Sequence, residues 1–179
     1  MTSVHSTGVE RTDCDELVAT FVRAFGDDNY WAARLAAFKQ REIGLHLAIF
    51  VEPYLTYLLE GRKTVESRFS MRRYPPYGRV SPGDLVLIKK SGGPIVGVCE
   101  VGDVWHYRLD PYSWKELRQT FTNALCAQDP AFWKAREAAS FATLMRVVSV
   151  RAVEPITFAK KDRRGWVVLS SSPSPQDTA

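Results

Sequence analysis

The chain of 179 residues has few cysteines, few histidines and no long apolar run. Its three cysteines are far apart and form no CxxC pair, which excludes a disulfide scaffold and a zinc ribbon. No apolar run approaches the roughly 20 residues of a membrane helix, and the chain does not start with a basic segment followed by an apolar block. We therefore expect a cytoplasmic protein without a membrane span. Because the histidines are isolated, we expect no metal and no cofactor.

The composition is that of a globular protein. Hydrophobic residues make up 45% of the chain, charged residues 25% and aromatic residues 12%. A chain of this length and composition has room for one domain with a substantial core plus short additions. An intrinsically disordered protein is excluded.

Positive charge is concentrated in two segments. Residues 62–90 carry a net charge of +6 and residues 158–166 carry +3, while the rest of the chain carries −5. Aromatic residues are interleaved with both segments. If the two segments meet, they form a basic face that suits nucleic acid; the alternative is that each is a solvated loop. The predicted nucleic-acid contacts are Arg62, Arg72, Arg73, Tyr74, Tyr77, Lys89, Lys90, Lys161, Arg163, Arg164 and Trp166.

The first part of the chain is predicted to be helical. Apolar residues recur at helical spacing over residues 12–25 and again over residues 30–40. We interpret residues 1–44 as an acidic N-terminal helical extension, and a protein partner bound through these helices is one hypothesis for it. On this interpretation, a nucleic-acid site elsewhere in the chain survives deletion of residues 1–40.

From residue 45 onward the apolar residues alternate, which is typical of strands. Helices are expected after Pro53 and over residues 114–125 and 130–139, and residues 170–179 are predicted to be a disordered tail. The fold class is therefore α+β, with a small closed or partly closed β-barrel interrupted by helical insertions. The strands are predicted at residues 45–51, 63–69, 85–88, 95–104, 141–153 and 166–169.

The most informative stretch runs from Gly61 to Arg68. Alternation along a strand places Glu66 and Arg68 on the same face, while Lys63 lies at the entry to that strand. Together they offer donors, one acceptor and a titratable amine to a ligand. A structural ion pair between Glu66 and Arg68 is the alternative interpretation.

These residues resemble a known family. Gly61, Lys63, Glu66 and Arg68 match the GxKxxExR signature of the ASCH domain, within the PUA-like superfamily. The order of predicted elements over residues 45–169 is similar as well. The resemblance implies a PUA-like β-barrel whose cleft is lined by these four ligand-binding residues. It also implies binding of RNA or of a modified nucleobase.

The same resemblance implies an alternative enzymatic function. Some family members are amidohydrolases acting on N4-acetylcytidine and others are ribonucleases acting on RNA. The amidohydrolases use a lysine, a threonine three residues later and a distant glutamate. Lys63 matches that lysine, but Glu66 stands at the threonine position and Thr64 comes two residues too early. In an enzyme, Lys63 and Glu66 are the expected catalytic pair. A protein-interaction module is the second alternative.

Overall fold

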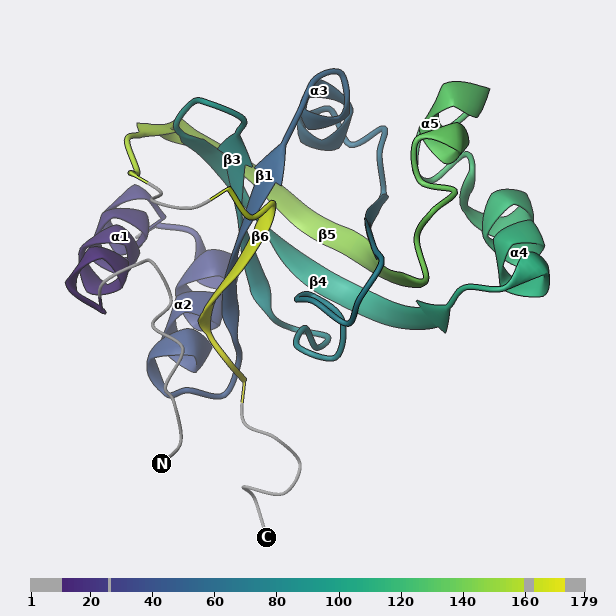
Figure 1. Ribbon diagram of the computed structural model, residues 1–179. Coiled ribbons are helices and arrows are strands. Elements are labelled where there is room, and N and C mark those ends of the chain that lie inside the picture. The colour runs from purple at the N-terminus through teal and green to yellow at the C-terminus, as the bar shows by residue number, and fades with distance from the viewer. Residues whose placement is uncertain (1–10, 26, 160–162, 173–179) are drawn as a thin grey trace, which may run out of the picture.

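The computed structural model describes residues 11–25, 27–159 and 163–172, and it shows one curved sheet flanked by helices (Figure 1). Helices α1 and α2 lie together on one side of the sheet, and α4 and α5 lie at the opposite side. The elements are α1 (Arg11–Ala24), α2 (Asn29–Lys39), β1 (Leu45–Phe50), α3 (Tyr54–Leu59), β2 (Val65–Ser70), β3 (Leu85–Lys90), β4 (Ile95–Arg108), α4 (Pro111–Phe121), α5 (Pro130–Lys134), β5 (Phe141–Ile156) and β6 (Trp166–Ser170).

The sheet is an open half-barrel with the strand order β2-β5-β4-β3-β1-β6. β1 and β3 are parallel, and every other neighbouring pair is antiparallel. The register between the long strands β4 and β5 shifts three times, and such bulges bend a sheet. The predicted α+β class and partly closed barrel are confirmed. β2 and β6 remain the two edges.

Some predicted boundaries differ from the observed ones. Strand β5 runs to Ile156 although Pro155 was expected to end it earlier, because Pro155 falls where the register with β4 shifts and no ladder donor is needed. Helix α4 begins at Pro111 because the Asp110 side chain accepts from the Ser113 amide at 2.8 Å and caps it. Helix α5 ends at Lys134, five residues before the predicted end.

The two N-terminal helices are built into the main core. Phe21 of α1, Phe25 just after it and Trp31 of α2 are buried in one cluster with Leu47 of β1 and Leu87 of β3. The apolar faces of both helices are thus covered by the sheet. Deleting residues 1–40 would expose that face of the sheet to water. The truncation would therefore disturb the barrel itself and does not test the helices separately. Binding of a protein partner through these helices remains a prediction.

The entry to β2 is fixed by local backbone geometry. Helix α3 ends at Leu59, and Gly61 has a φ of 72°, a conformation that costs glycine little. The amides of Arg62 and Lys63 both donate to the carbonyl of Tyr57 at 2.9 Å. The turn therefore places the Lys63 side chain at the start of β2 and directs it inward.

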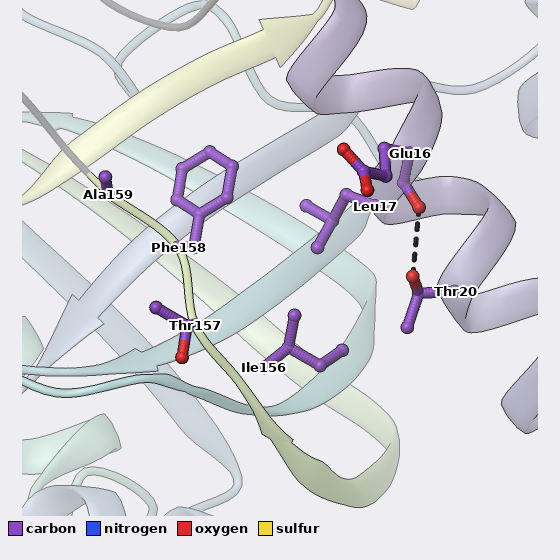
Figure 2. Close-up of a pocket in the computed structure, with 7 residues that line it drawn as sticks. All are labelled: Glu16, Leu17, Thr20, Ile156, Thr157, Phe158 and Ala159. Carbon is purple, nitrogen blue, oxygen red and sulfur yellow. Dashed lines mark hydrogen bonds between the residues drawn. The ribbon is translucent and has the colours of Figure 1, made fainter.

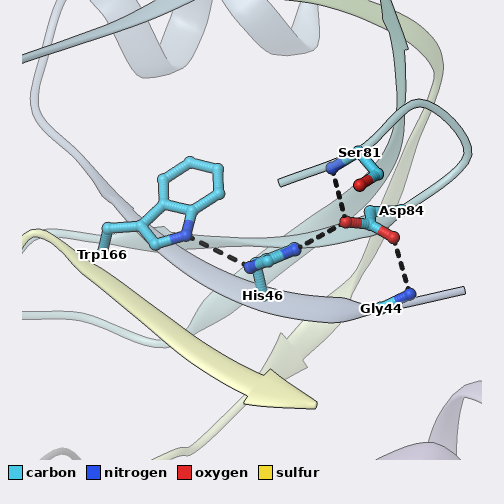
Figure 3. A network of polar contacts seen from close by, with 5 residues as sticks. All are labelled: Gly44, His46, Ser81, Asp84 and Trp166. Carbon is cyan, nitrogen blue, oxygen red and sulfur yellow. Dashed lines mark hydrogen bonds and ion pairs between the residues drawn. The ribbon is translucent and has the colours of Figure 1, made fainter. Parts of the chain in front are cut away.

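A polar network with buried His46, Asp84 and Trp166 side chains joins β6, β1 and the loop before β3 (Figure 3). The Trp166 indole donates from Nε1 to Nδ1 of His46 at 3.2 Å, and His46 Nε2 lies 3.0 Å from Asp84 Oδ2. Asp84 also accepts from the amides of Gly44 and Ser81. Because Nδ1 of His46 is the acceptor, its proton is on Nε2. This network fixes the orientation of the Trp166 ring.

Candidate functional site

The signature residues line a cavity of about 350 Å³ beside β2, which we call the β2 cavity. Its walls come from the end of β1, from α3, from β2 and from the chain around α5. The lining residues are Ile49, Phe50, Val51, Tyr54, Lys63, Glu66, Ser67, Arg68, Phe69, Phe132, Ala135 and Arg136.

Lys63 is buried against the floor of this cavity, with its side chain 3% exposed. Its Nζ donates to the carbonyl of Val65 at 2.6 Å and lies 3.3 Å from Oε2 of Glu66. Burial lowers the pKa of Lys63, because a charged amine loses its hydration there. The Glu66 carboxylate opposes that shift, and the positive charge of Arg68 adds to it. The sequence prediction that Lys63 lies beside Glu66 and Arg68 in one cavity matches this arrangement.

Arg68 links the two edges of the half-barrel. Its Nη1 donates to the carbonyl of Gly165 and its Nη2 to the carbonyl of Ile49, both at 3.0 Å. Its Nε lies 2.9 Å from Oε1 of Glu66 as a charge contact, although the N–H is not aligned for a hydrogen bond. Arg68 thereby connects β2 to the end of β1 and to the residue before β6. The guanidinium therefore bridges the two edge strands, β2 and β6, which are not paired through their backbones.

The ion pair between Glu66 and Arg68 is present, and ligand contact by the two residues stays a prediction. The two side chains form an ion pair, and they also line open space together with Lys63. Gly61 differs from the other three signature residues. It is exposed, it is not among the residues lining the cavity, and a Cβ there would meet nothing within 4 Å. Its positive φ is the structural reason for a glycine, so its predicted ligand contact finds no support in the geometry.

Three residues that the sequence analysis did not select complete the β2 cavity: Tyr54, Phe132 and Arg136. The Arg136 guanidinium lies 3.7 Å from the centroid of the Phe132 ring, and its Nη1 donates to the Phe132 carbonyl at 2.6 Å. The Nζ of Lys63 lies 5.9 Å from the centroid of the Tyr54 ring. No local pattern marks these residues, because only the packing of α3 and α5 beside β2 brings them to the site.

The model of the ASCH domain matches residues 49–161, which is more than half of the chain. The chain belongs to the ASCH-domain family. A structure of ASCH from Zymomonas mobilis is similar in fold, with a TM-score of 0.57 and 14% identity over 77% of this chain and 92% of that one. Two mutants of that protein are similar to the same degree. A serine-to-alanine mutant has a TM-score of 0.58 and 13% identity over 76% of this chain and 93% of that one. A tyrosine-to-phenylalanine mutant has a TM-score of 0.57 and 13% identity over 75% of this chain and 94% of that one. No curated protein matched the chain.

The two basic segments of this ASCH domain meet in space. The hydrogen bond from Arg68 to Gly165 joins them directly, as the basic-face prediction requires. Arg72, Arg73 and Tyr74 are exposed in the loop after β2, and Arg163 and Arg164 are exposed just before β6. RNA contact by these residues, and by the exposed Lys90, stays a prediction.

Three other predicted nucleic-acid contacts do not present their side chains freely to solvent. Lys89 is 7% exposed and donates to the carbonyl of Gly93, so it stabilises the β3–β4 turn and does not present its charge to solvent. Trp166 is 4% exposed and belongs to the core. Tyr77 packs against His106 and Phe141.

Arg62 is exposed and pairs with Glu60 at 3.3 Å, with its guanidinium over the Tyr57 ring. It lies outside the lining of the β2 cavity. Lys161 lies outside the residues that the structure describes.

A second region of the ASCH domain offers a different kind of cavity. About 240 Å³ lies between α1 and residues 156–159, lined by Leu17, Ile156 and Phe158 (Figure 2). Glu16 is the one charged side chain among its described lining residues. Because that one charge is negative, this cavity does not suit a phosphate. Among the described residues, no group of three or more His, Cys, Asp and Glu could hold a metal ion, and no helix is long and apolar enough to cross a membrane.

Proposed function

We propose that this ASCH domain binds single-stranded RNA and takes one base, ordinary or modified, into the β2 cavity. The observation that carries the proposal is the composition of that cavity, which places Glu66, Lys63 and Arg68 beside the rings of Tyr54 and Phe132. A nucleobase offers flat apolar faces and an edge of donors and acceptors. Aromatic walls with a few fixed polar groups are the surroundings that bind such a ligand.

The charge balance of the cavity favours a polyanion. Lys63, Arg68 and Arg136 face one carboxylate, that of Glu66, among the described lining residues. The two arginines alone outweigh the carboxylate, so the cavity carries a net positive charge whether or not the lysine is protonated. Arg72 and Arg163 add exposed positive charge in the two basic segments that meet at Arg68 and Gly165. A ligand with phosphates is attracted to such a site, and its affinity falls as salt screens the phosphates.

The test is a binding titration with the single-stranded RNA octamers U8, C8 and A8, followed by fluorescence anisotropy. We expect at least one octamer to bind, with an affinity that falls steeply between low and moderate salt. Arg136→Gln should weaken that octamer about tenfold, because a base or phosphate contact from arginine is lost. Arg23→Gln removes the same charge from the exposed surface of α1 and is the matched control.

The proposal predicts that the Arg23 control binds RNA within about twofold of wild type. A circular dichroism melt of each variant shows whether its fold is intact. Equal affinities of the two variants, or an affinity that does not respond to salt, contradict the proposal.

A second candidate function is hydrolysis of the amide bond of an acylated nucleoside, such as N4-acetylcytidine. The lowered pKa of Lys63 favours it, because an amine must be neutral to act as a general base. Water would add to the acetyl carbon, the C–N bond would break, and the amine of cytidine would take the proton. Thr64 is exposed and does not line the β2 cavity, so it does not replace the threonine of the amidohydrolases.

Chromatography of N4-acetylcytidine incubated with the protein tests this second candidate. Release of cytidine and acetate by wild type, abolished in Lys63→Ala, supports hydrolysis. RNA binding without any release supports a binding function alone. Incubation with an RNA octamer tests cleavage of the phosphodiester in the same way.

A further inference from the structure

A second cavity lies next to the β2 cavity, and Arg68 and Phe69 line both. It measures about 190 Å³ and is enclosed by the loop after β2 and by the residues at the start of β6. We call it the loop cavity. Besides the shared residues, its walls include Ser70, Tyr74, Pro75, Gly165 and Trp166.

We propose that the loop cavity holds the nucleotide adjacent to the base in the β2 cavity, so that the ligand is an RNA chain of at least two nucleotides. This inference rests on the proposed function and deepens it. It assigns the two cavities to consecutive nucleotides, with the phosphodiester between them passing over Arg68. A free nucleoside would then fill only half of the site.

The spacing of the two cavities fits one step along an RNA strand. Glu66 lines the β2 cavity alone, Arg68 lines both, and Ser70 lines the loop cavity alone. These residues lie on the same face of β2, and two residues of a strand span about 7 Å. The cavities are therefore offset along β2 by a distance on the scale of one nucleotide.

Arg68 is placed to contact the phosphate between the two nucleotides. A guanidinium has five N–H donors. Nη1 donates one to the carbonyl of Gly165, Nη2 donates one to the carbonyl of Ile49, and Nε lies 2.9 Å from the Glu66 carboxylate without a hydrogen bond. The second N–H of each Nη remains for a ligand, and the side chain is 20% exposed. These contacts hold the guanidinium in place, so a phosphate meets a group that needs no further ordering.

The walls of the loop cavity suit a base or a ribose. Tyr74 is 57% exposed and stands at the rim, next to the exposed ring of Pro75. At the back, Trp166 is held by its hydrogen bond to His46 (Figure 3). The Arg68 guanidinium lies 5.4 Å from the centroid of the Trp166 ring. Stacking on an aromatic ring is tolerant of sequence, because every base has a flat face. Exposed Arg72 lies two residues after Ser70, and exposed Arg163 lies two residues before Gly165, so both are near this cavity along the chain.

The experiment compares ligands of one and two nucleotides by competition against the octamer that binds most tightly. The competitors are the nucleoside and the dinucleoside monophosphate of the same base. For wild type we expect the dinucleoside monophosphate to compete at least tenfold better. Tyr74→Ala should remove most of that advantage and leave the nucleoside affinity within about twofold, since stacking of the second base is lost.

Tyr112→Ala is the matched control, because Tyr112 is 85% exposed on α4 and lines neither cavity. If Tyr74→Ala and Tyr112→Ala behave alike, or if the nucleoside competes as well as the dinucleoside monophosphate, this inference is wrong while RNA binding stands. If no octamer binds, the proposed function fails and this inference fails with it.

Discussion

The contact of Glu66 with two cations makes a strong prediction about stability. Its carboxylate lies 3.3 Å from the Lys63 amine and 2.9 Å from the Arg68 guanidinium. Glu66→Gln keeps the shape of the side chain and removes its charge, which leaves two cations close together with little hydration. Removing one partner of a buried ion pair costs about 3–5 kcal/mol.

We expect the lower end of that range, about 3 kcal/mol, because Arg68 is 20% exposed and water in the cavity screens its charge. In a protein of this size 1 kcal/mol corresponds to roughly 2–4 °C in Tm, so the expected loss is about 6–12 °C. Glu60→Gln is the control, since Glu60 forms an exposed pair with Arg62 worth at most about 1 kcal/mol.

The assay is urea unfolding of both variants at neutral pH, supported by thermal melts. The double variant Lys63→Met/Glu66→Gln completes the cycle. It should be less destabilised than the sum of its single variants, because the methionine removes one of the two cations left unpaired. If Glu66→Gln costs no more than Glu60→Gln, the three charges do not form the buried cluster on which the site depends.

Three further changes test other parts of the structure. Burial lowers the pKa of Lys63 below its ordinary value of 10.5. Between the lowered pKa and 10.5, Lys63 binds more protons in the unfolded chain than in the folded one, so the free energy of unfolding rises with pH. Lys63→Met should remove this rise, measured by urea unfolding between about pH 8 and 10. Arg68→Lys should lower the free energy of unfolding by about 1–3 kcal/mol, because an amine cannot reach both carbonyls and the carboxylate. The control Arg146→Lys changes an exposed ion pair and should lower it by less than about 1 kcal/mol. Asp84→Asn should cost about 2–4 kcal/mol in the same assay, because an amide –NH₂ would face the donors of His46 and the backbone; a stability equal to wild type would contradict the buried network.

Much of the fold could be predicted from the sequence because the local signals agree with the tertiary structure. Alternation of apolar residues marks the strands, and the turn at Gly61 follows from the end of α3. The curvature of the sheet was less accessible. Gly97, Gly102 and Pro155 lie at register shifts between β4 and β5, but these residues do not determine how far the register moves. The role of α1 and α2 as a cover of the sheet also depends on distant contacts.

The candidate site was only partly predictable. Lys63, Glu66 and Arg68 lie within six residues, and strand alternation is enough to bring them together. Arg136 comes from a segment that no local pattern connects to β2. The double contact of Arg68 with Ile49 and Gly165 depends on how far the barrel closes, which the sequence does not encode locally.

The most direct test of the central claim is a map of the RNA-binding surface by heteronuclear NMR, with a tightly binding octamer added to the labelled protein. The account predicts that the largest shift changes are those of amides at the end of β1, along β2, in the loop carrying Tyr74 and at Gly165. Changes confined to α1, α2 or the cavity at Phe158 would contradict it.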